Sequence, residues 1–476
     1  MPRLRPVHLL LLLPLLVYLA LPTRAYYWDG LAFAIAIEHD YPLRGLLHPN
    51  HLLYMPFGRM LWVAAQGAGL STRALFLLQR VNSVLAFASV LLVYRLLRRK
   101  GIKRGTAVAG AWAMAFSATW WKYSTDCDAY VTAIFCLLVA WFFLETGRWL
   151  PAAFALAAAM LFHELSILIL PAALLTLPAR QRFRLAALAL APVAAVYLWA
   201  YRVVQSQGAM AGFPRWLVSH SPDSSFSFAP LRNMWLSVLG TVRLFFGGKP
   251  AAVVPDLLTG SLVLVALAAL IALAILLRRA GRVRFGAPSM PLLVWAAVYV
   301  VFLFVWMPQN TFYRLFYLPP LILLAADLSC QARGREILGA VFVVLFSANF
   351  ALLIYPDSRV DHNPTLACAL RFEPQWPAGT PIVFERFHPD LWTISYFNPQ
   401  AAWIGWDSGD PSELDRYLAY ARSHGMPLWL EATAQEKLAE TENGRSWLLR
   451  HPQSGPALGC GGRGRNFRFF PIRAPQ

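Results

Sequence analysis

Apolar runs separated by short basic clusters make up the chain from its N-terminus to residue 355. Roughly 20 apolar residues in a helix cross a bilayer, so runs of this kind predict membrane-spanning helices. We predict about eleven spans, the fifth and sixth being half-length helices between Arg148 and Arg180. The other predicted spans are 7–21, 74–97, 105–121, 129–144, 185–201, 257–277, 288–306, 312–328 and 336–354. The pattern indicates an α-helical polytopic membrane protein.

The basic clusters set the direction of these spans, because short cytoplasmic loops of membrane proteins are enriched in Lys and Arg. The N-terminus is then cytoplasmic and the chain leaves the membrane outward after residue 354. The apolar stretch 51–70 is not counted as a span, since a crossing there would place the basic cluster at 95–104 outside. We expect it to form a helix at the outer interface, within a first outer loop at 22–73. The run 7–21 also has the length of a signal peptide, and either choice leaves the later topology unchanged.

The two half-length helices are predicted because one apolar stretch lies between two clusters that both face the cytoplasm. His163 and Glu164 interrupt this stretch. An ionisable pair at membrane depth needs a protein or water-filled surrounding. We therefore expect the chain to go out and return, with His163 near the turn.

The pattern changes at residue 356, where the apolar runs shorten. Strand-like runs at 381–385, 391–397, 401–406 and 427–430 alternate with a helical segment at Ser412–Ser423, which ends before Gly425. The closing residues are expected to form a last strand with a basic edge. We predict two parts: a transmembrane domain at 1–355 and a small extracytoplasmic α/β domain at 356–476.

Composition agrees with this class, since 58% of the residues are hydrophobic and only 14% are charged. The net charge of +18 comes from residues 1–355, which hold 30 Lys and Arg against 11 Asp and Glu. That excess is explained by the cytoplasmic clusters, so nucleic acid is not an expected partner. Cys368 and Cys460 could pair if the tail faces an oxidising compartment, and the sequence leaves this open.

Ionisable residues gather in the first outer loop, which we take as the candidate active site. Three of the 11 acidic residues of the membrane part, Asp29, Glu38 and Asp40, lie within twelve positions there, followed by His48 and His51. Membrane insertion alone would not concentrate acids in one loop. Asp29 has two interpretations, a catalytic base or an N-cap for a helix over 31–38. A second outer turn carries Asp126 and Asp128.

Several of these residues fall in an order that resembles a GT-C-class family of membrane glycosyltransferases related to protein O-mannosyltransferases. Asp29-Gly30, Glu38, and His48-Pro49 ahead of Tyr54 are similar to its first outer loop. Arg80-Val81-Asn82 resembles its R-V-N motif, WKYSTDCDAY over 121–130 its second outer turn, and His163 a histidine of its fifth span. The resemblance covers roughly residues 26–171. It departs where the family's D-x-G-E is Asp29-Gly-Leu-Ala and where H-P-P-G-Y-P is His48-Pro-Asn-His-Leu-Leu.

The resemblance implies transfer of a sugar from a polyprenyl-phosphate carrier to an acceptor at the outer face of the inner (cytoplasmic) membrane. The acceptor, a glycan, protein or lipid, is not defined by the sequence. Asp29 is the expected base, and Asp128 is expected to orient the acceptor or to help hold a divalent cation such as Mg²⁺ or Mn²⁺, a cofactor left open. The expected substrate-binding residues are Glu38, His48, His51, Arg80, Lys122, Tyr130, His163 and Arg314. Among these, Arg314 at the outer end of the tenth span is the main candidate for the lipid phosphate.

Two other function classes stay open. A transporter or flippase for a lipid-linked glycan would place ionisable residues at mid-bilayer on broken helices, a description that only His163-Glu164 fits. A non-catalytic cell-envelope assembly protein would use the outer domain for binding alone. A zinc site at His48, His51, His163 and Glu164 is not favoured, since no HExxH or similar spacing occurs.

Overall fold

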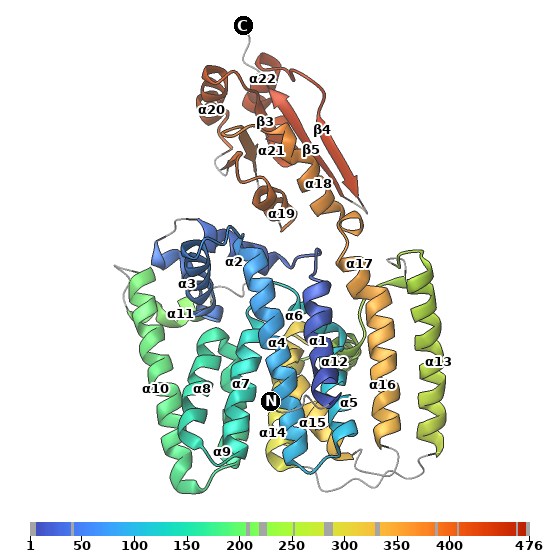
Figure 1. Cartoon of the computed structure of the whole chain (residues 1–476). Helices are drawn as coiled ribbons and strands as arrows, with labels where there is room; N and C mark the ends of the chain where they lie inside the picture. The colour runs from blue at the N-terminus through green and yellow to red at the C-terminus, as the bar shows by residue number, and fades with distance from the viewer. Residues whose placement is uncertain are drawn as a thin grey trace. The chain divides into compact units, whose positions relative to one another are not determined.

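The computed structural model describes residues 6–39, 42–205, 210–218, 226–250, 253–279, 289–328, 334–385, 389–406, 409–462 and 465–472. The chain divides into two compact units. Unit 1 comprises Met1–Thr23 and Phe33–Ser358, and unit 2 comprises Arg24–Ala32 and Arg359–Gln476. In Figure 1 the helices of unit 1 run from blue to orange and the sheet of unit 2 is coloured orange to red.

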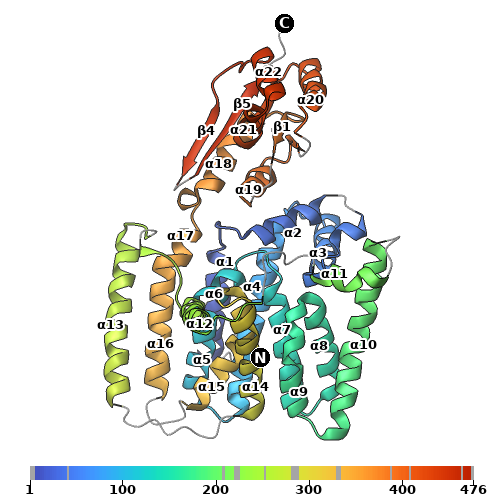
Figure 2. The same ribbon diagram turned by 180° about the vertical axis from the view of Figure 1, so that it is seen from behind.

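Unit 1 consists of helices joined by short segments. Its α-helices are α1 (Pro6–Ala20), α2 (Trp28–Glu38, whose first turns belong to unit 2), α3 (Tyr54–Gly67), α4 (Ala74–Arg99), α5 (Arg104–Ala115), α6 (Ala118–Ser124), α7 (Tyr130–Glu145), α8 (Trp149–Phe162), α9 (Leu170–Leu175), α10 (Ala179–Val204), α11 (Phe213–Val218), α12 (Pro230–Phe245), α13 (Leu257–Arg279), α14 (Met290–Trp306), α15 (Leu318–Leu328), α16 (Gly334–Asn349) and α17 (Tyr355–Asp357). The connecting 3-10 helices include η1 (Leu43–Leu46), η2 (Pro49–His51), η3 (Glu164–Ile169), η4 (Met210–Gly212) and η6 (Phe312–Tyr317), and a π-helical turn, η7 (Phe350–Ile354), follows α16. Figures 1 and 2 show α7, α8 and α10 side by side, with α13 beside α16.

Apolar helices dominate unit 1, as the sequence predicted. In the described part, four helices are long and apolar enough to cross a membrane: Ala74–Arg99, Ala179–Val204, Leu257–Arg279 and Arg335–Asp357. Six shorter apolar helices accompany them, among them Tyr130–Glu145 and Met290–Trp306. The count of eleven spans stays a prediction.

The expected span at 105–121 is not one continuous helix, because the chain divides there into α5 and α6. Phe116 and Ser117 separate the two helices. The side-chain amide of Asn349 donates to the carbonyl of Phe116 at 2.8 Å and to that of Phe245 at 2.7 Å. A partner distant in sequence thus satisfies a carbonyl that the break would otherwise leave unpaired in the interior.

The expected break near His163 is confirmed. Helix α8 ends at Phe162, and His163 begins η3, which continues into α9. A helix is also confirmed where 51–70 predicted one, as α3. Its location at a membrane surface stays a prediction.

Unit 2 is a five-stranded sheet with helices on both faces. Its elements after η8 (Val360–His362) are α18 (Pro364–Phe372), η9 (Glu373–Gln375), β1 (Pro381–Phe384), α19 (Pro389–Phe397), β2 (Ala402–Gly405), α20 (Pro411–Ser423), β3 (Leu428–Glu431), α21 (Ala432–Glu440), α22 (Glu442–Arg450), β4 (Leu458–Gly462) and β5 (Arg465–Ile472). The strand order is β2-β1-β3-β5-β4, with β1 parallel to β2 and β3, and β5 antiparallel to β3 and β4.

The strands of unit 2 alternate between two cores, as side chains of a sheet must. Ile382 and Phe384 of β1 face the core that α18 and α19 cover, whereas Val383 faces the core that α20, α21 and α22 cover. The expected strands at 381–385, 401–406 and 427–430 and the helix at Ser412–Ser423 are confirmed. Gly425, predicted to stop that helix, has a φ of +70°, which suits glycine.

The expected strand at 391–397 is wrong, because this segment is helix α19. Its β-branched and aromatic residues suggested a strand. Leu391 and Ile394, three residues apart, are both fully buried against the sheet, which is helical spacing. Pro389 at its first position supplies a helix start that the sequence analysis did not use.

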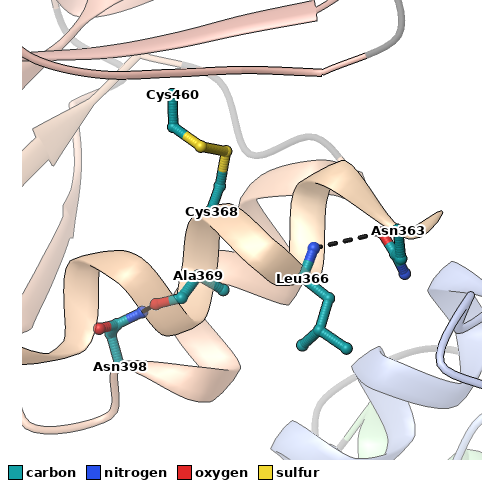
Figure 3. The surroundings of a disulfide bond; sticks show 6 residues. All are labelled: Asn363, Leu366, Cys368, Ala369, Asn398 and Cys460. Atoms are coloured by element: carbon teal, nitrogen blue, oxygen red, sulfur yellow. Dashed lines mark hydrogen bonds between the residues drawn. A yellow bond between two sulfur atoms is a disulfide. The ribbon is translucent and has the colours of Figure 1, made fainter. Parts of the chain in front are cut away.

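Cys368 and Cys460 form a disulfide in unit 2 (Figure 3). It joins α18 to β4 across 92 positions of sequence. Beside it, the side chain of Asn363 accepts the Leu366 N–H at the start of α18, and Asn398 donates to the carbonyl of Ala369 at 2.9 Å. The pairing that the sequence left open is therefore made, and it closes the core beneath α18.

Candidate active site

The turn between α6 and α7 is held by side chains of α4. The amide of Asn82 donates to the carbonyls of Asp126 and Asp128, each at 2.8 Å. One turn earlier on α4, Gln79 donates to the carbonyl of Thr125 at 2.9 Å. The R-V-N segment thus fixes the backbone of the second outer turn.

Two fully buried carboxylates belong to this turn. One oxygen of Asp126 accepts the N–H of Cys127 at 2.8 Å, and one oxygen of Asp128 accepts the N–H of Ala129 at 2.7 Å. These bonds orient the side chains along the turn directly before α7. The Asp128 carboxylate is therefore held next to Tyr130, the first residue of α7.

Aromatic and imidazole rings pack together next to this turn. His51 of η2 meets His163 edge to face, with ring centroids 4.6 Å apart. Tyr130, the first residue of α7, lies 5.2 Å from His163 and 6.1 Å from His51 by ring centroids. We call these three residues the imidazole cluster. The structure therefore brings together residues that the sequence predicted as substrate-binding from three separate segments.

Two ring nitrogens of the imidazole cluster are buried without a hydrogen-bond partner among the described residues: Nδ1 of His51 and Nε2 of His163. Nδ1 of His163 accepts the N–H of Leu165 at 3.2 Å, so the neutral ring carries its hydrogen on Nε2. Burial lowers the pKa of His51 well below its usual value, and the neighbouring His163 lowers it further. These nitrogens can bond a ligand hydroxyl or phosphate oxygen without a charged imidazole.

Further rings enclose the cluster. Tyr130 lies 5.2 Å from both Tyr123 and Phe312 and 5.9 Å from Tyr313 by ring centroids. His48, half-buried, stacks on His51 at 5.7 Å. Flat apolar rings around polar nitrogens are typical of sites that bind sugars or other small polar ligands. Phe312 and Tyr313 were missed by the sequence analysis, because no local pattern indicates that η6 packs against His163.

The carboxylate of Glu38 accepts hydrogen bonds from other residues of unit 1. Its two carboxylate oxygens accept from Arg73 at 2.7 Å and from the Ala74 N–H at 2.6 Å. These bonds stabilise the start of α4, since a carboxylate satisfies the unpaired amide at a helix N-terminus. As placed, Glu38 stabilises the start of α4, and its expected contact with the substrate stays a prediction.

Asp29 lies in the first turn of α2, in the segment Arg24–Ala32 that belongs to unit 2. The helix begins at Trp28, three residues earlier than the expected start at Leu31. Asp29 is therefore inside the helix rather than its cap, and is half-buried. Its role as base stays a proposal. Asp40 lies outside the described residues.

Arg314, expected at the outer end of the tenth span, is buried within unit 1. Its guanidinium donates to the carbonyls of Asn310 at 2.9 Å and Pro308 at 2.6 Å, and to the hydroxyl of Tyr317 at 2.6 Å. A Cβ at Gly240 of α12 would come within 2.3 Å of this side chain. These hydrogen bonds hold η6 in place, and Arg314 would have to break them to bind a lipid phosphate.

Two other predicted cations differ in exposure. Arg80 is exposed on α4. Lys122 of α6 lies 3.6 Å from Asp357, and both side chains are between a quarter and a third exposed. Lys122 can therefore exchange a carboxylate partner for a phosphate without unfolding its surroundings.

The donors for a metal are sparse. Within the described ranges, no group of three or more His, Cys, Asp or Glu residues could hold a metal ion. Asp126 and Asp128 direct an oxygen each to the backbone amide that follows. A divalent cation at the site stays a prediction.

Two solved structures match the chain over nearly its whole length. ArnT from Cupriavidus metallidurans in its apo state matches with a TM-score of 0.62 over 99% of both chains, at 12% sequence identity. ArnT bound to undecaprenyl phosphate matches with a TM-score of 0.60 over 99% of this chain and 98% of that one, also at 12% identity. The fold is the GT-C fold. The expectation from the outer-loop motifs is thereby confirmed at the level of fold.

The arabinofuranosyltransferase AftD from Mycobacteria also resembles the chain, with a TM-score of 0.47, 15% identity, and coverage of 98% of this chain but 40% of AftD. That score is too low to support a further conclusion. No protein-family profile and no curated protein sequence matches the chain.

Proposed function

We propose that this protein is an integral-membrane glycosyltransferase. It moves a sugar from a polyprenyl-phosphate carrier to an acceptor at the outer face of the inner membrane. The observation that carries the proposal is the imidazole cluster beside the Asp128 turn, because it joins unpartnered polar nitrogens, aromatic walls and a buried carboxylate in one place. The fold supports it, since an ArnT structure with this fold was solved with bound undecaprenyl phosphate.

The proposed chemistry is a displacement at the anomeric carbon. The acceptor oxygen attacks that carbon while a carboxylate takes the hydroxyl proton, and the bond from the anomeric carbon to the phosphate oxygen breaks. We assign proton removal to Asp29 and orientation of the acceptor to Asp128. The leaving lipid phosphate gains negative charge on oxygen, which a lysine stabilises, and Lys122 replaces Arg314 as our candidate for this role.

The imidazole cluster is assigned to the sugar. Nε2–H of His163 can donate to a sugar hydroxyl and Nδ1 of His51 can accept from one or donate to one, depending on its tautomer. Tyr130 offers a ring face beside them. Since burial favours neutral rings, these residues suit a polar, uncharged part of the donor.

The orientation proposed for the chain has the N-terminus in the cytoplasm and unit 2 outside. The Cys368–Cys460 disulfide supports it, because such bonds persist in oxidising compartments and are rare in the cytosol. The basic clusters support it independently through the positive-inside rule.

The test is transfer of radiolabelled sugar from polyprenyl-phosphate donors to acceptors in membranes that contain the full chain. Asp29→Asn and Asp128→Asn are compared with Asp361→Asn, whose carboxylate pairs with Arg359 at the surface of unit 2. We expect transfer by the wild type and by Asp361→Asn. Loss of a general base should slow transfer by about 10²–10⁴-fold in Asp29→Asn, and loss of an orienting group by about 10²-fold in Asp128→Asn.

The other function classes give different outcomes in the same membranes. Movement of a lipid-linked glycan across the bilayer without bond formation would identify a transporter or flippase. Specific glycan binding with neither transfer nor movement would identify an assembly protein. Near wild-type transfer by a folded Asp29→Asn protein would remove Asp29 as base and leave Asp128 as the remaining candidate.

A further inference from the structure

A cavity of about 260 Å³ lies between α1, α5 and α16, apart from the imidazole cluster. Its walls are almost entirely apolar: Leu10, Val108, Ala109, Trp112 and Phe342. The rings of Trp112 and Phe342 are tilted at 46° to each other, with centroids 4.6 Å apart. Figures 1 and 2 show α5 and α16 side by side, so these walls come from neighbouring helices. The shape and chemistry suit a hydrocarbon chain.

Two arginines line one end of this cavity. Arg104 is the first residue of α5, and Arg335 lies in the first turn of α16. Glycine at position 105 permits their approach, because a Cβ there would come within 3.1 Å of Cδ of Arg335. The N-terminus of α5 adds its unpaired amides to the same place. The two arginines and the helix N-terminus therefore place positive charge at one end of an apolar cavity.

The cavity is open at one position of α16. A Cβ added at Gly339, which lines the cavity, would meet no heavy atom within 4 Å. A side chain could occupy this space without displacing neighbours. The chain instead leaves a channel over Gly339 that continues from the arginines toward Trp112 and Phe342.

We propose that this cavity binds an anionic phospholipid. Its phosphate lies between Arg104, Arg335 and the first turn of α5, and one acyl chain follows the apolar walls past Gly339. Basic pockets between transmembrane helices bind anionic head groups in this way, with charge and chain recognised together. Under the predicted orientation both arginines face the cytoplasmic leaflet, so this site is separate from the sugar-transfer site of the outer face.

A bound lipid would fix α16 against α5. Helix α16 leads through η7 to Asp357, the partner of Lys122. The chain of contacts is continuous within unit 1, since Asn349 at the end of α16 also bonds the break between α5 and α6. The lipid is therefore expected to stabilise unit 1.

The experiment uses the full chain purified in detergent and reconstituted in nanodiscs of phosphatidylcholine with or without phosphatidylglycerol. Native mass spectrometry identifies the retained lipid, and thermal unfolding measures its effect. We expect wild type to retain phosphatidylglycerol in preference to phosphatidylcholine, with about fivefold preference contributed by each arginine, and to unfold at higher temperature when it is present.

Variants separate the two halves of the site. Arg104→Gln with Arg335→Gln should remove the preference for the anionic lipid, whereas Arg180→Gln, an exposed arginine at the start of α10, should keep it. Gly339→Leu should fill the channel and abolish retention. Gly260→Leu is its control, because Gly260 of α13 also has no atom within 4 Å of an added Cβ but lies outside the cavity.

Three outcomes overturn the proposal. Equal retention of both phospholipids by wild type would mean that the arginines do not select charge. Unchanged selectivity in the double arginine variant, or unchanged retention in Gly339→Leu, would place the lipid elsewhere. Release of the retained lipid by added polyprenyl phosphate would show that the cavity binds the carrier instead.

Discussion

The two units satisfy the hydrogen-bonding groups of their backbone in different ways. In unit 2, helices begin with a side chain that accepts a backbone N–H of the first turn. These pairs are Asn363 with Leu366 at 3.2 Å, Asp410 with Ser412 at 2.9 Å, Glu431 with Thr433 at 2.8 Å, and Thr441 with Gly444 at 3.0 Å. Each is a local bond between residues two or three apart, which a helix in water uses to hold its first turn.

In unit 1, side-chain amides of buried asparagines donate to backbone carbonyls that are distant in the sequence. Among its described helices, α5, α7, α8 and α10 begin at a residue whose side chain accepts no backbone N–H of the first turn. Its buried Asn82, Asn233 and Asn349 each donate to two carbonyls, and the carbonyl most distant in sequence is 233 positions away. In apolar surroundings an unpaired carbonyl is costly, so amides are placed where the chain departs from regular helix. These departures include the turn that carries Asp128.

Removing the disulfide should have the largest effect on unit 2. The bond closes a loop of 92 positions, for which the chain-entropy estimate is about 4.6 kcal/mol of unfolding free energy. Hydrogen exchange of residues 359–472 in Cys368→Ser with Cys460→Ser should show this loss. Cys136→Ser, a free cysteine of α7, is the control. Protection equal to wild type would mean that the sheet and caps alone hold unit 2.

Asn82→Leu tests the amide bonds of unit 1. The apolar side chain leaves the carbonyls of Asp126 and Asp128 without this donor, at about 1–3 kcal/mol each. We expect loss of about 3 kcal/mol in unfolding experiments, and loss of transfer, because the turn moves. Ser261→Ala on α13 removes only an exposed bond within its own helix and should change stability by less than about 0.5 kcal/mol. Equal effects of the two variants would contradict the comparison.

Acid should destabilise unit 1 through His51. Its pKa is lowered in the folded chain, so below the unfolded value of about 6.5 the unfolded state binds a proton that the folded state does not. The stabilisation is complete above that pH and is lost as pH falls, by up to about 1.4 kcal/mol per pH unit.

Unfolding measured between pH 7.5 and 5 should show this slope, and His51→Phe should reduce it. His424→Gln, at an exposed position of unit 2, should leave it unchanged. A slope that is the same in wild type and His51→Phe would assign the acid sensitivity to other groups.

Capping in unit 2 should have the smallest effect. Thr441→Ala removes the bond to Gly444 and should cost about 1 kcal/mol of unfolding free energy. Thr441→Ser keeps the hydroxyl and should restore most of it. If alanine and serine behave alike, packing of α22 rather than its cap decides the stability of this helix.

The resemblance in sequence located much of the candidate site, but it did not identify which residues meet. His51, Tyr130 and His163 were predicted from three separate segments, and the structure packs their rings together. Arg314 was expected outside because it follows an outward span, yet η6 turns it into the interior. Glu38 was expected at the substrate, and in the structure it stabilises the start of α4.

By itself the sequence determined the class of the protein, the break at His163, and most strands and the helix of unit 2. These features follow from hydrophobic periodicity and from turn residues, which act over a few neighbouring positions. Tertiary structure alone decided that the chain breaks at Phe116 and that Asn82 holds the Asp128 turn. Each of these features depends on a hydrogen-bond partner that is distant in the sequence, and no local pattern of residues predicts such a partner.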